Sequence, residues 1–377
     1  MRKLNFYVFL VVLLFGIQTL TSQQRFETNQ AAAEFKFTTW NTEWLSCTQN
    51  GPTDENLQIN NVVTVIKAVN PDVIALQEVG TSSLYSTIDT LVKRLGVEWG
   101  GAMVTSSSVD NCGQNQGLIY KKSKIQLLNA SLMTNAGASY DWSSGRYPVL
   151  YNVNLIAGSS LIPVSFVNIH AKAMGDESSY TRRKNASISL KALLDGSGYN
   201  SKNVVVLGDF NDYLSGSQCN TCGDSPYKNF VDDTQNYKCL TGSLYDPNYN
   251  SPVIDNIIIS NELIASYKAN STLREVSATQ SVYNFQNTTS DHVPVSATFS
   301  IINTSVETNE DLPESKITVV GKRIKIENQQ ALPVVIFDVT GRVLYSNKHL
   351  KTDEIAVNQS GICVVCSGNR ACKVVVE

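Results

Sequence analysis

The chain has 377 residues, of which 42% are hydrophobic and 17% are charged, and its formal net charge is −3. This composition is typical of a globular protein, and the length suffices for one large domain and a small one. The mild acidity argues against a basic protein that coats nucleic acid. An enzyme acting on nucleic acid remains compatible, because it needs positive charge only near the scissile phosphate.

The chain begins with a segment typical of a secretory signal peptide. The basic residues Arg2 and Lys3 precede an apolar stretch over residues 6–17, and Thr21-Ser22 supplies small residues for cleavage. The alternative is an uncleaved membrane anchor, but the apolar stretch is too short to span a bilayer comfortably. We expect residues 1–22 to be removed and the mature protein to be exported, without stable insertion into a membrane.

Strand and helix patterns alternate from residue 35 to about residue 302. Apolar residues at helical spacing predict helices over 56–69, 83–95 and 178–194. Apolar runs bounded by turn residues predict strands over 35–40, 73–76, 117–120, 125–128, 149–156, 164–169, 204–207, 254–259 and 295–301. Strands 149–156 and 164–169 follow each other across a short turn, which favours antiparallel pairing. We expect an α/β domain over residues 35–302, with two mixed β-sheets packed as a sandwich and helices outside.

The composition changes after this region. Residues 303–316 are polar and acidic and contain Pro313, which is typical of a linker. Short strands separated by turns are then predicted over 317–320, 323–326, 334–338, 342–345 and 373–376. No helical pattern is visible there, so we expect residues 317–377 to form a small all-β sandwich.

Eight cysteines are present, five before the linker and three after it. In an exported protein they are first of all disulfide candidates. Cys47 and Cys112 both fall in predicted loops and are one possible pair. Cys219 and Cys222 form a Cys-x-x-Cys motif, for which a zinc knuckle or a redox pair is the alternative, although no second such motif lies nearby to complete a zinc site. The pairing itself is not fixed by the sequence.

Polar side chains gather at the ends of the predicted strands. If these strands lie side by side, the side chains meet at one rim, and such rims build active sites on rigid scaffolds. The candidates along the chain are Asn41, Glu43, Glu78, Arg146, His170, Asp209, Asn211, Asp255, Asp291 and His292. Two of the three histidines of the chain are in this set, and histidine can take up or release a proton near neutral pH.

Oxygen-bearing side chains in this set indicate a Mg²⁺ site. Mg²⁺ prefers oxygen ligands and keeps several waters, so one or two carboxylates and an amide suffice. Glu78 is the first expected ligand, with Asn41, Glu43 and Asp291 as helpers. The metal would sit beside the scissile phosphate.

The remaining candidates suit the cleavage of a phosphate ester. Asp209 and Asn211 are placed to hold and polarise the attacking water, and a protonated histidine or the metal would stabilise the transition state. His292 paired with Asp255 is a candidate general base, because the carboxylate fixes the imidazole tautomer. Arg146, together with Asn211, is expected to bind the substrate phosphate.

The order of these motifs resembles the endonuclease/exonuclease/phosphatase superfamily, which has the deoxyribonuclease-I-like fold. The resemblance covers residues 35 to about 302. It rests on Trp40-Asn41, Gln77-Glu78, Arg146-Tyr147-Pro148, Asn168-Ile169-His170, Gly208-Asp209-Phe210-Asn211-Asp212, Ile254-Asp255 and Ser290-Asp291-His292. It implies a four-layer α/β sandwich that hydrolyses phosphate diesters or monoesters with Mg²⁺ or Mn²⁺.

The same resemblance assigns roles to the site residues. It makes Glu78 the metal ligand and Asn41 the first Asn of the family. It makes His170 and His292 the catalytic histidines, supported by Asp209, Asn211, Asp255 and Asp291. Glu43 falls where only some members place an acidic ligand.

The C-terminal module resembles the sorting domain of the type IX secretion system. The resemblance rests on residues 337–344, 361–365 and 373–376, and the chain departs from it at Cys363, where an aromatic residue is usual. It implies that secretion machinery is a partner, and that the protein is released or held at the outer cell surface.

Three further expectations concern side chains outside the main set. Arg182-Arg183-Lys184 is predicted to be a solvated helix face that can also contact phosphate. Trp44 or Trp142 is a candidate for stacking on a base. Asp110-Asn111-Cys112 and Asp232-Asp233 are candidate structural Ca²⁺ sites.

The sequence therefore predicts a secreted, monomeric, metal-dependent nuclease. We expect an endonuclease that hydrolyses extracellular DNA, with RNA as an open alternative. A second hypothesis is a secreted sphingomyelinase-like phospholipid phosphodiesterase, which would need apolar loops for membrane docking. A third is an adhesin on a dead catalytic fold, which would show substitutions among the motif residues, and none is found.

Overall fold

A computed structural model describes residues 32–81, 87–106, 112–301, 315–368 and 370–376. The expected signal peptide and all of the expected linker except its last two residues lie outside this part of the chain. Among the described residues, no helix is both long enough and apolar enough to cross a membrane.

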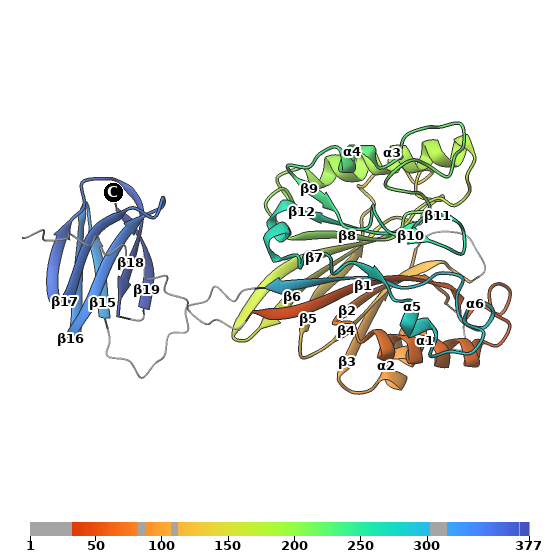
Figure 1. The fold of residues 1–377 in the computed structure, drawn as a ribbon, viewed down its shortest axis with the longest axis horizontal. Helices are drawn as coiled ribbons and strands as arrows, with labels where there is room; N and C mark the ends of the chain where they lie inside the picture. The colour runs from red at the N-terminus through yellow and green to blue at the C-terminus, as the bar shows by residue number, and fades with distance from the viewer. Residues whose placement is uncertain (1–31, 82–86, 107–111, 302–314, 369, 377) are drawn as a thin grey trace, which may run out of the picture.

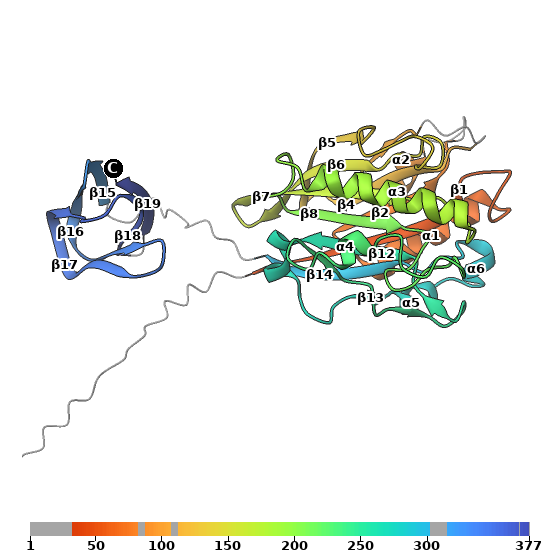
Figure 2. The same ribbon diagram turned by 90° about the horizontal axis from the view of Figure 1, so that it is seen from above.

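The N-terminal region is an α/β sandwich of four layers (Figure 1). Its first sheet has the strand order β13-β14-β1-β2-β4-β3, and its second has the order β5-β6-β7-β8-β12-β9. Helices α1 (Glu55–Val69) and α2 (Thr87–Leu95) cover the outer face of the first sheet, and α3 (Glu177–Leu194) and α4 (Lys228–Val231) cover that of the second. In the view from above, α3 lies over the second sheet (Figure 2). The expected fold class is confirmed.

The strands of the first sheet are β1 (Ala33–Leu45), β2 (Val73–Val79), β3 (Trp99–Val104), β4 (Asn115–Lys121), β13 (Leu273–Arg274) and β14 (Val295–Ile301). Those of the second are β5 (Ile125–Leu132), β6 (Val149–Ala157), β7 (Ser160–His170), β8 (Val204–Asp209), β9 (Tyr237–Cys239) and β12 (Asp255–Ser260). A hairpin of β10 (Tyr245–Asp246) and β11 (Ser251–Pro252), the 3₁₀ helix η1 (Asn261–Ser266) and the short helices α5 (Val276–Thr279) and α6 (Phe285–Thr288) complete the region.

Both sheets are mixed, as expected. β1 pairs with β2 in parallel and β7 pairs with β8 in parallel, whereas β6 and β7 form the predicted antiparallel pair. The two parallel pairs decide where the site lies, because β1, β2, β7 and β8 all end at the same rim.

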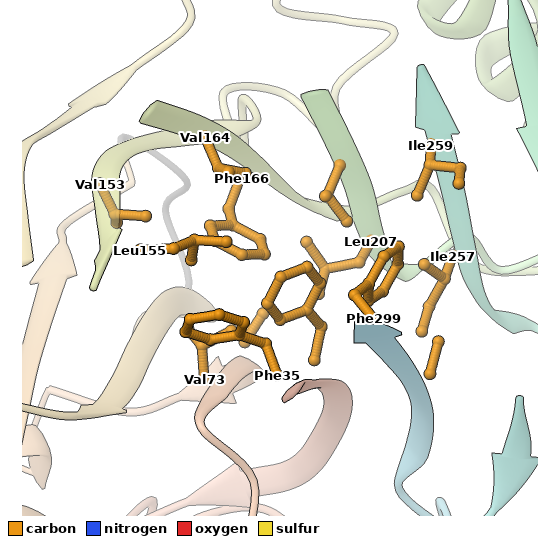
Figure 3. Packing of buried hydrophobic residues seen from close by; sticks show 14 of the residues in the cluster. Phe35, Val73, Val153, Leu155, Val164, Phe166, Leu207, Ile257, Ile259 and Phe299 are labelled. Carbon is orange, nitrogen blue, oxygen red and sulfur yellow. The ribbon is translucent and has the colours of Figure 1, made fainter. Parts of the chain in front are cut away.

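An aromatic core holds the two sheets together (Figure 3). Phe37 of the first sheet stacks on Phe299 at 4.5 Å between ring centroids and meets the edge of Phe166, from the second sheet, at 4.9 Å. Closer to the rim the contact becomes polar. Buried Asn168 donates to the carbonyls of Leu76 and Gly117 and accepts a hydrogen bond of 2.8 Å from Gln77. These bonds fix the sheets relative to each other beneath the site.

Strand β3 is absent from the sequence expectations. Its Gly100 and Gly101 weaken the strand pattern, since glycine has low strand propensity. The structure explains Gly100, because a Cβ there would lie 2.6 Å from the ring of Tyr120 on the neighbouring strand. The close packing of Tyr120 favours glycine at position 100, and this glycine weakens the apolar pattern by which a strand is predicted.

The C-terminal region is all-β, as expected, and is built as a curled sheet. Its strands are β15 (Ser315–Val320), β16 (Arg323–Asp338), β17 (Val343–Ala356), β18 (Gly361–Ser367) and β19 (Arg370–Val376). The prediction of separate strands over 323–326 and 334–338 is wrong, because β16 runs through both and its pairing register with β17 shifts between them. Inward side chains such as Ile324, Ile336 and Val365 form its core, in which Cys363 is fully buried and acts as a small apolar residue. The assignment to a secretion sorting domain stays a prediction.

Disulfides link Cys47 to Cys112 and Cys219 to Cys222. Cys219 and Cys222 are therefore bonded to each other in this structure and are not zinc ligands. Among the described cysteines, Cys239, Cys363, Cys366 and Cys372 are free thiols.

Candidate active site

The predicted site residues come together at the rim where β1, β2, β7 and β8 end. One cavity of about 360 Å³ is lined by nine of them, namely Asn41, Glu43, Glu78, Arg146, His170, Asp209, Asn211, Asp291 and His292. The tenth, Asp255, opens strand β12, which runs antiparallel to β8 and places Asp255 directly opposite Asp209. Strand direction therefore explains why residues at the start of β12 and just before β14 meet residues at the ends of β7 and β8.

The backbone is unusual at three of these positions. Glu43, Glu78 and Asn211 have φ angles of 47°, 57° and 50°, in the left-handed region that non-glycine residues seldom adopt. The pairing of β1 with β2 also shifts register between Asn41 and Leu45. Backbone strain of this kind is concentrated at functional sites, where it sets the direction of a side chain.

Asn41 links the two carboxylates at the bottom of the cavity. Its amide nitrogen donates to Glu78 Oε1 at 3.2 Å and to Asp209 Oδ2 at 3.0 Å. Asp209 also accepts from the backbone N–H of Asn211 at 2.8 Å and from the Asn211 side chain at 3.1 Å. Burial, reinforced by Asp255 and opposed by His292, raises the pKa of Asp209 to about 6. Asp209 is thus held rigidly and titrates near neutral pH.

His170 lies between the same two carboxylates. Its Nε2 is 3.5 Å from Glu78 Oε1 and 3.5 Å from Asp209 Oδ2. Burial, with help from the positive charges of Arg146 and His292, lowers the pKa of His170 well below its usual range. His170 is therefore neutral at physiological pH, and its buried Nδ1 has no hydrogen-bond partner among the described residues.

His292 has the opposite charge state. Its Nδ1 is 2.7 Å from Asp255 Oδ2, and its Nε2 lies 4.0 Å from Asp209 Oδ2. Burial disfavours the charged imidazole, but the carboxylates of Asp255, Asp209 and Asp291 outweigh burial and raise the pKa of His292 well above its usual range. The site therefore contains one neutral and one protonated histidine.

Glu43 and Asp291 form a second acidic pair at the mouth of the cavity. The backbone N–H of Asp291 donates to Glu43 Oε2 at 2.9 Å. Burial and the charge of Asp291 raise the pKa of Glu43 to about 7. This pair is more exposed than Glu78 and Asp209, and Asp291 has a side-chain exposure of 49%.

Arg146 supports His170 through the backbone. Its Nε donates to the carbonyl of His170 at 2.9 Å, and its Nη2 donates to the carbonyl of Ala171 at 2.8 Å. The guanidinium also contacts Ser143 and Gln114. Arg146 is buried but still lines the cavity. Its observed contacts hold the loop after His170. Its contact with phosphate stays a prediction.

The expectation of a solvated face over Arg182-Arg183-Lys184 is wrong for Arg183. Arg183 and Asp212 are fully buried and form an ion pair with an N–O distance of 2.7 Å. Arg183 also donates to the carbonyls of Lys172 and Met174. The pair connects the loop after His170 to the loop that carries Asn211, and it therefore stabilises the position of both loops.

The structure also bears on the expected stacking tryptophan and on the expected Ca²⁺ sites. Trp142 is 1% exposed and cannot stack on a base, whereas Trp44 lines the cavity. Asp232 and Asp233 form ion pairs with Lys228 and Lys191, which leaves the predicted Ca²⁺ site there without support. Asp110 and Asn111, of the other candidate Ca²⁺ site, lie outside the described residues.

The donor set at the bottom of the cavity fits a divalent cation. Among the described residues, no three His, Cys, Asp or Glu side chains form a ready-made metal cage. Mg²⁺ does not need one, because it keeps several waters and is usually bound through one or two carboxylates. Burial also raises the pKa of Glu78, and the charge of nearby Asp209 adds to this, so a bound cation would offset a real electrostatic cost there.

The family assignment follows from this arrangement of motifs and fold. The family model described as Endonuclease/Exonuclease/phosphatase matches residues 38–292, and the chain belongs to that family. No curated protein sequence matches the chain significantly.

Several solved structures are similar to the chain at low sequence identity. An endonuclease/exonuclease/phosphatase from Bacteroides vulgatus is 15% identical, with a TM-score of 0.53 over 71% of this chain and 99% of that one. A second, from Beutenbergia cavernae, is 12% identical, with a TM-score of 0.51 over 91% of this chain and 100% of that one. The catalytic domain of human nocturnin with bound sulfate is 15% identical, with a TM-score of 0.49 over 71% of this chain and 94% of that one.

The structure also adds residues that the sequence did not single out. Gln114 contacts the Arg146 guanidinium, and Asn50 and Gly51 line the cavity beside Trp44. No motif marks these positions, since they reach the site from loops whose path depends on the packing of both sheets.

Proposed function

We propose that this protein is a metal-dependent phosphodiesterase that cleaves nucleic acid. The observation that carries the proposal is that one cavity is lined by His292, whose Nδ1 lies 2.7 Å from Asp255, and by the carboxylates of Asp209 and Glu78. This places a hydrogen-bond donor for a phosphate oxygen opposite groups that can hold water and a cation.

The cation would be held by Glu78 with Asn41, and Glu43 and Asp291 would approach it from the mouth of the cavity. Mg²⁺ or Mn²⁺ bound there supplies positive charge that stabilises the negative charge on the phosphate as the ester bond breaks. The raised pKa values of Glu78 and Glu43 support this, because both carboxyl groups sit in an environment that favours a neutralising partner.

Asp209 is the group best placed to activate water. Its two oxygens are fixed by Asn41 and Asn211, and its pKa of about 6 leaves it mostly ionised at neutral pH and still able to accept a proton. Asn211 donates to Asp209 and lines the cavity, so it can orient both the water and the phosphate.

His292 acts as a charged donor in this scheme. Asp255 holds its Nδ1, which leaves the Nε2–H to donate to a nonbridging phosphate oxygen. Because the pKa of His292 is raised, we prefer this role to the general-base role expected from the motif. Neutral His170, whose Nε2 is 3.5 Å from both Glu78 Oε1 and Asp209 Oδ2, helps to position these carboxylates.

The substrate and the location of the enzyme are further parts of the proposal. We propose DNA as the substrate and export through the predicted signal peptide, with the C-terminal region engaging type IX secretion machinery and the protein acting as a monomer. The second candidate function is a sphingomyelinase-like activity, in which the same site residues would hydrolyse a phospholipid phosphodiester.

A substrate panel tests the proposed function. Purified full-length protein is incubated with plasmid DNA, RNA and sphingomyelin vesicles, each with Mg²⁺ and with a chelator. We expect cleavage of DNA that the chelator abolishes. Release of phosphocholine from the vesicles, with intact DNA, would instead establish the second candidate, and inactivity of folded protein on all three would overturn the proposal.

Metal affinity is expected to fall with decreasing pH. Protons compete with the cation for Glu43, whose pKa is about 7, and for Glu78, whose pKa is also raised. Below pH 7 the affinity for Mg²⁺ should therefore weaken by about tenfold per pH unit for each proton displaced. Isothermal titration calorimetry at pH 8, 7 and 6 measures this, and Glu43→Gln should flatten the dependence. An affinity that stays constant from pH 8 to pH 6 would contradict the assignment of these ligands.

A further inference from the structure

A second cavity, of about 310 Å³, adjoins the catalytic cavity on the side of strands β12 and β14. We call it the side chamber. Asn211, Asp291 and His292 line both cavities, so a ligand whose phosphate lies at His292 can extend directly into the side chamber. No role predicted from the sequence uses this space.

The chemistry of the side chamber suits a flat, uncharged ring. Its walls include the phenol rings of Tyr213 and Tyr249 and the apolar side chains of Pro252, Val253 and Val293. Planar aromatic systems gain stability by stacking on such rings, and polar groups nearby fix their orientation. Gln218 supplies such a group, and it is itself anchored to the backbone carbonyl of Asn211 at 3.2 Å.

The charges in the side chamber disfavour a second phosphate. Its single arginine, Arg274, forms an ion pair with Asp246 at 2.6 Å, and both side chains are largely buried. The remaining carboxylates of the lining are Asp255 and Asp291, and the first of these is bound to His292. An anionic group would therefore meet net negative charge, whereas the amino groups of a base would meet acceptors.

Tyr249 is placed to close the side chamber. It lies in the loop of the β10–β11 hairpin and is 60% exposed, although it lines the cavity. Asp246, at the start of this loop, accepts a hydrogen bond of 2.9 Å from the backbone N–H of Asn248 and forms the ion pair with Arg274, so the start of the loop is held in place. An exposed aromatic ring on this loop, beside a phosphate site, is placed to stack on a base.

We infer that the side chamber binds the nucleobase attached to the scissile phosphate, with Tyr249 stacking on the base. Tyr249 is thus a specificity-determining residue that favours nucleotide esters over esters without a base. The inference rests on the proposed function, since it presumes that a phosphate lies in the catalytic cavity and accepts a hydrogen bond from His292.

Inhibition of plasmid cleavage tests the inference separately from the function. Cleavage without inhibitor reports on the proposed function. The ratio of the inhibition constants of 2-deoxyribose 5-phosphate and deoxyadenosine 5′-phosphate, at saturating Mg²⁺, reports on the side chamber. We expect the nucleotide to inhibit at least about tenfold more strongly, which corresponds to the stacking of one base. Tyr249→Ala should bring the ratio close to one, and Tyr249→Phe should preserve it.

A matched control is Tyr283→Ala, since Tyr283 is 93% exposed and lines neither cavity. It should leave the ratio unchanged. Equal inhibition by the two compounds in the wild-type protein, or an unchanged ratio in Tyr249→Ala, would overturn the inference while leaving the proposed function intact. Stronger inhibition by phosphocholine than by the nucleotide, lost in Tyr249→Ala, would overturn it in favour of an ammonium headgroup in the side chamber.

Discussion

Replacement of Asp209 by Asn is expected to lower kcat for DNA cleavage by a factor of about 10²–10⁴, the usual contribution of a positioned general base. The substitution keeps the size of the side chain but removes the group whose pKa, about 6, suits it to take a proton from water. It also disturbs the hydrogen bonds that Asp209 accepts from Asn41 and Asn211.

Initial rates of plasmid cleavage at saturating Mg²⁺ measure this effect, and circular dichroism confirms that the variant is folded. Asp232→Asn is the matched control, because Asp232 is exposed, with a side-chain exposure of 59%, and pairs only with Lys228 among the described ion pairs. A variant at Asp209 that keeps more than half of the wild-type kcat would show that another group activates the water.

The second large effect concerns stability. Asp212→Ala is expected to lower the free energy of unfolding of the N-terminal region by about 3–5 kcal/mol, because it leaves the buried charge of Arg183 without its partner. The substitution also removes the acceptor for the backbone N–H groups of Tyr213 and Gln218. The lost ion pair and the lost hydrogen bonds both stabilise the loop that begins at Asn211.

Urea unfolding followed by tryptophan fluorescence measures this change. All four tryptophans of the chain lie in the N-terminal region, so the signal reports on that region alone. Glu34→Ala is the control, since its ion pair with Lys268 is exposed on both sides and should contribute little. An equal, small shift of the midpoint in both variants would contradict the structural role of the Arg183–Asp212 pair.

The sequence predicts the layered fold because most of its strands contain short apolar runs or an alternation of apolar and polar residues. Strands β2 and β8 are buried along almost their whole length, and the pattern finds both. It misses β3, where Gly100 leaves room for the ring of Tyr120, and it divides β16, whose polar middle segment resembles a turn. In each case a tertiary contact, or an exposed stretch within a long strand, overrides the local signal.

The candidate site could be predicted as a set of residues but not as an arrangement of charges. The motifs supply His170 and His292 equally, whereas only the structure shows that burial keeps the first neutral and that Asp255 keeps the second protonated. Arg183 has the sequence context of a surface helix and is nevertheless buried. The side chamber depends on a hairpin that the sequence pattern does not reveal, because β10 and β11 have only two residues each.

The central claim is that this cavity cleaves phosphodiester bonds, and conversion of supercoiled plasmid by the purified protein tests it most directly. Wild-type protein and His170→Ala are compared with Mg²⁺ and with a chelator. We predict nicked and then fragmented DNA from the wild-type protein with Mg²⁺, and intact plasmid in the other three reactions. Cleavage of equal rate by folded His170→Ala would contradict the claim, because the activity would then arise outside the site described.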